Sequence, residues 1–120
     1  MTKKKVLIVE DEMIISLMLE QMISRIGHEV VDKVTTGEMA VERAVAMQPD
    51  IILMDIRLQG KMDGIEAMLE IQKTTNIPVI YITGNTDQMY KRRIKETQYL
   101  DFLVKPITQH QLSNSLDLAS

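Results

Sequence analysis

Short apolar runs recur along this chain at an almost even interval, and this spacing limits the possible folds more than any other feature. The runs begin at residues 5, 29, 51, 78 and 101, so successive starts lie 24, 22, 27 and 23 residues apart. Each interval leaves room for one helix between two short strands, an alternation typical of a parallel sheet covered by helices. We predict strands at Lys5–Val9, Glu29–Lys33, Ile51–Met54, Pro78–Ile82 and Asp101–Val104.

The clearest helical pattern lies in the first interval, where a single apolar stripe ends at Gly27. Ile14 and Leu17 lie beside this stripe, and we interpret them as peripheral core and only secondarily as a contact surface. The stripe residues, which we expect to face the sheet, are Ile15, Met18, Leu19, Met22 and Ile26.

Capping motifs predict where two further helices begin. Asp63 is followed three residues later by Glu66, and Thr108 by Gln111, which is the spacing of a capping box. A weaker amphipathic pattern, interrupted by a run of cations, predicts a helix from about residue 86 to residue 97. With right-handed crossovers, five such strands and helices form an open, doubly wound α/β sheet. Ligands bind to sheets of this kind at the carboxyl ends of the strands.

Length and composition exclude several classes of protein. We expect 120 residues to form one domain, residues 1–120, and the absence of cysteine removes disulfides, thiolate metal sites and thiol nucleophiles. The net charge of −3 gives no general attraction to nucleic acid, and no apolar run approaches the length of a membrane helix. We see no signal peptide and expect a cytoplasmic protein. His28, at an expected exposed strand entry, and His110 have no metal-ligand company.

Polar residues follow the central strands at the points where these strands end. Glu10 and Asp11 follow the first strand, Asp55 the third, Thr83 the fourth and Lys105 the fifth. Each alone is explained as a turn former or a cap, but together they place three carboxylates at one edge of the sheet. Clustered carboxylates repel one another, and a hard cation such as Mg²⁺ would relieve this repulsion. With Lys105 and Mg²⁺ the group becomes neutral and ready for a phosphoryl group.

The motifs "VLIVEDE", "DIILMDIRL" followed by "MDGIE", "PVIYITG" and "FLVKPI" occur in this order and at spacings that resemble the receiver domain of two-component response regulators. The resemblance covers essentially the whole chain. It implies a flavodoxin-like (βα)5 fold with strand order 2-1-3-4-5. It also implies a phosphorylation-dependent signalling switch that is not an enzyme beyond its own phosphorylation and dephosphorylation.

The resemblance assigns the phosphoryl chemistry to the end of the third strand. Asp55 matches the aspartate that accepts a phosphoryl group from a histidine kinase or a phosphotransfer protein. Glu10, Asp11 and Asp55 match the ligands of Mg²⁺, together with the backbone carbonyl of Arg57. The Arg57 side chain would flank the phosphoryl group and tune its hydrolysis, although a merely solvated side chain explains this position equally well.

The resemblance also assigns residues that sense the phosphoryl group. Lys105 matches the lysine that pairs with a phosphoryl oxygen, and the bond to the following proline is expected to be cis. Thr83 matches the hydroxyl that closes on the group, with Gly84 and Asn85 flanking it. Phe102 matches an aromatic switch that turns inward when Thr83 moves, which would reshape the face formed by the fourth helix, fifth strand and fifth helix.

This chain departs from the usual pattern at several positions. Glu10 replaces the more common aspartate, Phe102 lacks the hydroxyl of a tyrosine, and Gly84 replaces a small residue that is usually alanine. The loop after Asp55 is one residue longer than in most receivers and lacks their proline, with Gly60 supplying a turn instead. We expect this loop to be more mobile than usual, whereas the fold and the site should hold.

Two other functions use similar chemistry. A small Mg²⁺-dependent phosphohydrolase also uses a strand-end aspartate as nucleophile, but it requires a second acid where Arg57 stands and a cap over its substrate. A flavin-binding electron carrier shares the sheet, but residues 10–12 would repel the phosphate of its cofactor. The output partner stays open, and so does a phosphorylation-dependent dimer. The domain is expected either to act alone or to belong to a larger regulator, and we expect no direct contact with nucleic acid or membrane.

Overall fold

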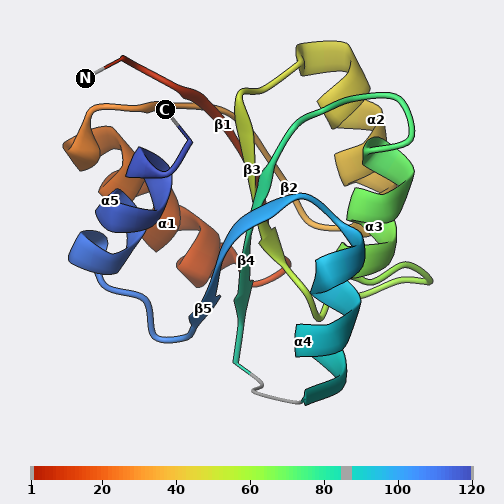
Figure 1. Cartoon of the computed structure of the whole chain (residues 1–120). Helices are drawn as coiled ribbons and strands as arrows, with labels where there is room; N and C mark the ends of the chain where they lie inside the picture. The colour runs from red at the N-terminus through yellow and green to blue at the C-terminus, as the bar shows by residue number, and fades with distance from the viewer. Residues whose placement is uncertain (1, 85–87, 120) are drawn as a thin grey trace.

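A computed structural model describes residues 2–84 and 88–119 and contains the predicted parallel sheet with helices on both faces (Figure 1). Its strands are β1 (Lys5–Val9), β2 (Glu29–Val34), β3 (Ile51–Asp55), β4 (Val79–Thr83) and β5 (Tyr99–Val104). The order in the sheet is β2-β1-β3-β4-β5 and every neighbouring pair is parallel, which confirms the predicted doubly wound, flavodoxin-like fold. All residues of β3 and β4 are buried, as expected for strands covered on both faces.

Local sequence signals set the ends of the helices. Asp63 and Glu66 form a complete capping box, as do Thr108 and Gln111. Gly27 ends the first helix with a φ of 106°, a left-handed conformation that glycine adopts without strain. The helices are α1 (Met13–Ile26), α2 (Gly37–Met47), α3 (Gly64–Ile71), α4 (Gln88–Arg93) and α5 (Gln109–Asp117), with a 3₁₀ turn η1 (Ile94–Glu96) after α4.

The helix predicted over residues 86–97 is shorter and less regular than expected. Regular helix covers only α4, which continues as the 3₁₀ turn η1, and the predicted start at residue 86 lies outside the described residues. Only Ile94 in this segment is a buried apolar residue, and its carbonyl accepts a hydrogen bond from Thr97 Oγ1 at 2.7 Å. A single buried apolar side chain stabilises only a short helix, so the turn that contains Ile94 is a tighter 3₁₀ turn.

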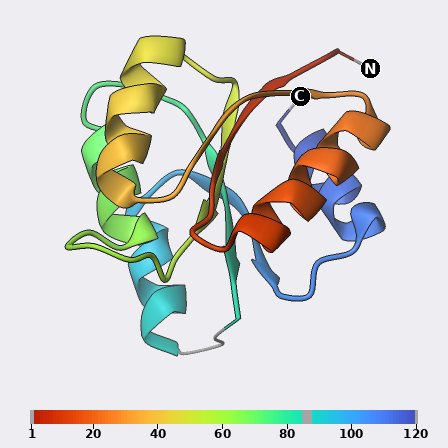
Figure 2. The ribbon, with the colours of Figure 1, turned by 180° about the vertical axis from the view of Figure 1, so that it is seen from behind.

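Alternate residues of the strands face two separate cores. Helices α1 and α5 cover one face of the sheet, and α2, α3 and α4 cover the other, as the front and back views show (Figures 1 and 2). The first face buries Leu19, Ile23 and Leu112 against β1, β3 and β4, and the second buries Tyr81 and Met68. Among the described residues, no helix combines the length and the apolar character needed to cross a bilayer.

The interpretation of α1 was partly wrong. Leu19 and Ile23 are buried, whereas Met18, which we assigned to the inward stripe, is 50% exposed. Ile14 and Leu17 are 75% and 44% exposed, so they are surface residues and not peripheral core. The helix is rotated relative to the predicted stripe because it packs on α5 as well as on the sheet.

In each edge strand, an aspartate side chain accepts a hydrogen bond from a backbone N–H of the same strand. In β2, the Lys33 N–H donates to Asp32 Oδ1 at 2.8 Å, and in β5 the Phe102 N–H donates to Asp101 Oδ1 at 2.8 Å. Each edge therefore has one N–H that is engaged by the side chain of the preceding residue.

Candidate functional site

Four of the predicted site residues lie together at the carboxyl edge of the sheet. Glu10 follows β1, Asp55 ends β3, Thr83 ends β4 and Lys105 follows β5. Since the four strands are parallel neighbours, their ends lie side by side, and backbone bonds fix their level. The Lys105 N–H donates to the Thr83 carbonyl at 2.8 Å, and the peptide bond before Pro106 is cis, as predicted.

Three carboxylates form a compact group at this edge. Glu10, Asp11 and Asp55 each offer an oxygen, and these oxygens all lie within 4.8 Å of one another. Glu10 and Asp55 are only 1% and 3% exposed, whereas Asp11 is half-buried. Burial of negative charges at this spacing costs free energy unless a cation neutralises them.

Lys105 supplies one such cation. Its Nζ lies 2.8 Å from Glu10 Oε1 and 2.9 Å from Asp55 Oδ2, so one ammonium bridges the ends of β1 and β3. Burial raises the pKa of Glu10 to about 7, although Lys105 and the N–H of Glu12 act in the opposite direction. Burial acts to lower the pKa of Lys105, but the two carboxylates outweigh it and raise this pKa.

The acidic group fits a divalent metal. One ammonium leaves the three carboxylates with a net negative charge, and carboxylate oxygens are the ligands that Mg²⁺ prefers. Asp11 is the most accessible of the three, so an ion would reach the group from the solvent side. This arrangement gives an acidic pocket of the kind that holds Mg²⁺, with Asp55 as its innermost strand residue.

The segment after β3 is held tightly against the end of that strand. Asp55 Oδ1 accepts a hydrogen bond from the Arg57 N–H at 3.2 Å, and the Gly64 N–H donates to the Ile56 carbonyl at 2.8 Å. A side chain at Gly64 would collide with the Asp55 carbonyl and the Met54 side chain. Only glycine allows α3 to begin so close to β3, a requirement that the sequence pattern alone did not reveal.

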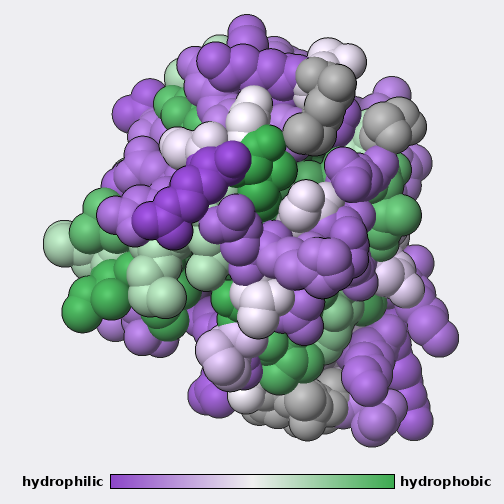
Figure 3. Space-filling view, turned by 90° about the vertical axis from the view of Figure 1, so that its left-hand side faces the viewer, coloured by the Kyte–Doolittle hydropathy of each residue, from purple (hydrophilic) through white to green (hydrophobic). Residues whose placement is uncertain are grey.

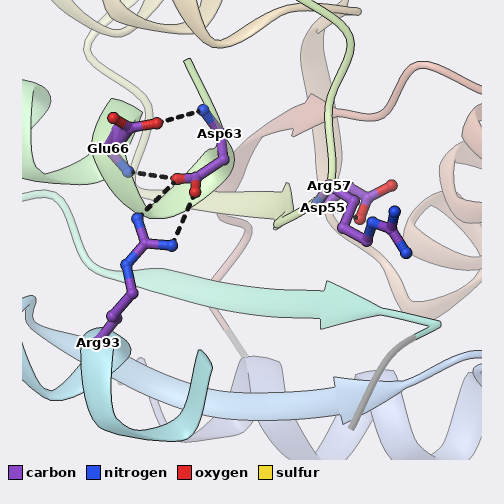
Figure 4. A network of polar contacts seen from close by, with 5 residues as sticks. All are labelled: Asp55, Arg57, Asp63, Glu66 and Arg93. Atoms are coloured by element: carbon purple, nitrogen blue, oxygen red, sulfur yellow. Dashed lines mark hydrogen bonds and ion pairs between the residues drawn. The ribbon is translucent and has the colours of Figure 1, made fainter. Parts of the chain in front are cut away.

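The loop between β3 and α3 also contacts α2 and α4. Figure 4 shows Asp55 and Arg57 at the end of β3, and a separate cluster where Asp63 binds both Glu66 and Arg93. Arg93 Nη1 lies 2.8 Å from Asp63 Oδ2, and its second terminal nitrogen lies 3.2 Å from Oδ1. The cap of α3 is therefore also the anchor of α4, a long-range pair for which the sequence carries no signal.

The predicted sensing residues lie on β4, β5 and the segments that follow. Thr83 is fully buried, and Phe102 is half-buried and packs against the core that contains Tyr81. Gly84 is exposed, and a side chain there would meet no atom within 4 Å. Asn85 lies outside the described residues.

An apolar cavity opens beside the acidic group, between α1 and the segment after β5. Its volume is about 360 Å³, and Lys105, which also bridges the carboxylates, is part of its lining. Hydrophobic side chains gather on the adjoining surface at the left edge of Figure 3, and those exposed on α1 are Met13, Ile14, Leu17 and Met18. The remaining lining residues are Ile15, Met18, Leu19, Met22, Pro106 and Ile107.

Comparisons with known proteins identify relatives of the whole chain. Residues 6–117 match the family model described as the response regulator receiver domain. The chain is 34% identical to the chemotaxis protein CheY of Thermotoga maritima, and the match covers 98% of each protein. It is 32% identical to the transcriptional regulatory protein PdtaR of Mycobacterium tuberculosis, over 97% of this chain and 56% of PdtaR.

A solved structure agrees closely with the fold. The signal receiver domain of a modulated diguanylate cyclase from Desulfovibrio desulfuricans is 33% identical and superposes with a TM-score of 0.92. The match covers 98% of this chain and 94% of that domain. The chain thus spans about half the length of PdtaR but nearly all of CheY.

Proposed function

This chain belongs to the response regulator receiver domain family, and from that premise we propose that it is a signalling switch phosphorylated on Asp55. One observation carries the proposal. The buried Asp55 carboxylate ends a central strand, lies 2.9 Å from Lys105 Nζ and shares an acidic pocket with Glu10 and Asp11. The phosphoryl donor is a histidine kinase or a phosphotransfer protein.

The proposed reaction is a phosphoryl transfer between two side chains. An Asp55 carboxylate oxygen attacks the phosphorus, a P–O bond forms, and the P–N bond to the donor histidine breaks with its electron pair returning to the imidazole. Lys105 then pairs with a phosphoryl oxygen, since its ammonium already lies at the attacking carboxylate. The hydrogen bond that the Arg57 N–H donates to Asp55 Oδ1 orients the carboxylate.

Glu10, Asp11, Asp55 and the backbone carbonyl of Arg57 would hold Mg²⁺. When bound, Mg²⁺ supplies positive charge that offsets the charge of the transferring group. The oxygens of Glu10, Asp11 and Asp55 already lie within 4.8 Å of one another, which supports this assignment of the metal ligands.

The donor is proposed to dock on α1. The exposed apolar side chains of this helix adjoin the cavity that Lys105 lines, so an apolar anchor seated there would bring a donor histidine to the mouth of the pocket. This surface leaves α4 and β5 free for output.

The conformational response is proposed to run through β4 and β5. Thr83 would close on the phosphoryl group, and Phe102 would then turn further into the core against which it already packs. That movement would change the face formed by α4, β5 and α5, because Phe102 lies in the wall between β5 and α4.

The first prediction tests the acceptor. Incubation with Mg²⁺ and acetyl phosphate should add a single acid-stable, base-labile phosphoryl group, detected by intact-protein mass spectrometry, and Asp55→Asn should abolish it. Asp50→Asn is the matched control because Asp50 lies just before the same strand, at its opposite end, and its Oδ2 accepts the Lys5 N–H at 2.8 Å. A modification that survives in Asp55→Asn would contradict the proposal, and so would its loss in Asp50→Asn.

A further inference from the structure

Apolar packing holds the helix α4 only weakly. None of its six residues is buried, although Tyr90 is half-buried and packs against the core that contains Tyr81. A hollow of about 720 Å³ lies between α4 with η1 on one side and β5 on the other, so the helix has room to move toward this strand. The position of a helix with so few buried contacts depends on its polar contacts.

Buried hydrogen bonds hold the carboxyl end of α4, at η1 and the residue after it. Thr97 Oγ1 donates to the Ile94 carbonyl at 2.7 Å and lies 2.8 Å from the Tyr81 hydroxyl oxygen. Because the single proton of Thr97 Oγ1 is used for Ile94, the Tyr81 hydroxyl donates the second bond. All three residues are buried, so breaking these bonds would leave polar groups unpaired. A movement of α4 would therefore turn about η1.

The other polar contact of α4 is the ion pair between Arg93 and Asp63 (Figure 4). Arg93 Nη1 donates to Asp63 Oδ2 at 2.8 Å and Nη2 donates to Oδ1 at 3.2 Å, so the guanidinium contacts both carboxylate oxygens. The two side chains are 33% and 27% exposed, so water can replace these hydrogen bonds when the pair opens. The ion pair is therefore easier to break than the buried contacts at η1.

Asp63 is fixed in place and cannot follow α4. Its Oδ1 accepts the Glu66 N–H at 2.8 Å, and its own N–H donates to Glu66 Oε1 at 2.9 Å. The next residue, Gly64, donates its N–H to the Ile56 carbonyl and lies so close to the Asp55 carbonyl that a side chain would collide with it. The carboxylate that holds α4 thus belongs to a segment packed directly on the end of β3, next to the proposed acceptor.

We infer that the pair Asp63–Arg93 is a latch, which holds α4 in place and opposes the response of the domain to a phosphoryl group on Asp55. The inference rests on the proposed function, in which Phe102 turns inward and changes the face that includes α4. Since α4 would turn about η1 while Asp63 stays on β3, this response must open the latch. The latch therefore stabilises the conformation that has not responded, and by linkage it lowers the affinity of the acidic pocket for a phosphoryl group or its analogue.

Two simpler roles of Arg93 give different expectations. If Arg93 only stabilised the fold, its removal would leave the affinity of the pocket unchanged or reduced. If it acted only through its charge, its removal would lower the affinity for an anion, because a cation attracts an anion over a distance. The latch requires the opposite result, an increase in affinity.

The test measures the binding of beryllofluoride, a phosphoryl analogue, with Mg²⁺ to the full chain by isothermal titration calorimetry. Arg93→Gln should bind it at least about threefold more tightly than the parent protein. Arg93→Lys keeps the charge but not the contact with both oxygens, and its affinity should lie between the two. Arg92→Gln is the matched control, because it removes the same charge from the neighbouring exposed residue and should leave the affinity unchanged.

A double-mutant cycle shows whether the two side chains act as one unit. Asp63→Asn removes the charge of the carboxylate but keeps an oxygen that can cap α3, and it should raise the affinity to a similar extent. The double variant Asp63→Asn with Arg93→Gln should then bind no more tightly than either single variant. Additive effects would show that the two residues act separately, and they would overturn the latch.

The outcomes distinguish the latch from the proposed function. Unchanged or weaker binding in Arg93→Gln overturns the latch and leaves the switch in place, and so does an equal increase in Arg92→Gln. Beryllofluoride that fails to bind the parent protein, or that binds Asp55→Asn equally well, overturns the proposed function, and the latch falls with it.

Discussion

At the residue scale, two opposing influences act on the pKa of Glu10. Burial favours its neutral form and raises its pKa to about 7, while the Lys105 ammonium at 2.8 Å favours the carboxylate. A shorter aspartate at this position would leave a gap toward Lys105 that the extra methylene of Glu10 closes. The glutamate that stands here in place of the more common aspartate is therefore compatible with the ion pair between Glu10 and Lys105.

His28 shows where prediction from the sequence failed at this scale. We expected an exposed residue at the entry of a strand, but His28 is only 4% exposed. Its Nδ1 accepts a hydrogen bond from the Lys4 N–H at 3.0 Å, a contact between residues 24 positions apart. The left-handed turn at Gly27 directs the chain back toward β1, and no local pattern announces such a contact.

A second prediction concerns pH. Burial, and then the charge of Lys4, lower the pKa of His28, while Asp117 acts in the opposite direction. Because its pKa in the folded protein lies below the ordinary histidine value of 6.5, His28 contributes stability above that pH, and this contribution is lost as pH falls through the folded pKa. His28→Asn, whose Oδ1 can accept the Lys4 N–H, should therefore lose less stability between pH 7.5 and pH 5.5 in urea unfolding.

His110→Asn is the control for this prediction because His110 is exposed on α5. Its stability should change over the same pH range to the same extent as that of the parent protein. Titration of Glu10 acts in the opposite sense but is common to all three proteins, so it cancels in the comparison. An unchanged pH dependence in His28→Asn would show that His28 does not titrate as described.

At the element scale, the loop between β3 and α3 connects three helices to β3. Gln59 forms an isolated parallel β-bridge with Thr36, just before α2. The absence of a side chain at Gly37 leaves room for Met62. Gly60 has a φ of 100°, which confirms the turn that the sequence predicted there. The greater mobility of this loop, expected from its extra residue, stays a prediction. The contacts with the start of α2 would restrict such motion.

Local and non-local signals explain which elements could be predicted. The starts of α3 and α5 were predictable because each capping box lies within four consecutive residues. The end of α4 was not, because that helix is held by Ile94 beneath it and by Asp63, which is 30 positions from Arg93. Contacts of this kind are decided by the packing of the whole molecule.

A third prediction tests this link between α3 and α4. Arg93→Gln should lower the free energy of unfolding by about 0.5–1 kcal/mol, because the pair is about one-third exposed, and it should speed hydrogen exchange of the α4 amides. Arg92→Gln is the neighbouring control, since Arg92 is exposed and has no partner among the described residues. Equal effects of the two substitutions would mean that the pair does not hold α4.

At the scale of the whole molecule, one sheet separates two cores that share its strands. Neighbouring residues of β1, such as Val6 and Leu7, belong to opposite cores, so neither core can form without the sheet. The site was largely predictable for the same reason. Parallel strands bring their carboxyl ends to one edge, so the order of the strands fixes which side chains meet.

A fourth prediction follows from this shared sheet. Ile23→Ala removes a fully buried side chain from the core at α1 and should cost about 3 kcal/mol, whereas Leu17→Ala, at 44% exposure, should cost less than about 1 kcal/mol. The Tyr81 ring lies in the opposite core, so the tyrosine signal in near-ultraviolet circular dichroism reports on the other face. In Ile23→Ala this signal should be lost at the same urea concentration as the helical signal. A tyrosine transition that keeps the parent midpoint would show that the two cores unfold separately.

The aspartates on β2 and β5 have a consequence for the protein at high concentration. An edge strand with free amide groups is a template on which further chains can stack into fibrils. Asp32 and Asp101 each engage one of these amides within their own strand, and each adds a negative charge at the edge. Both features oppose the pairing of edge strands between crowded copies of the molecule.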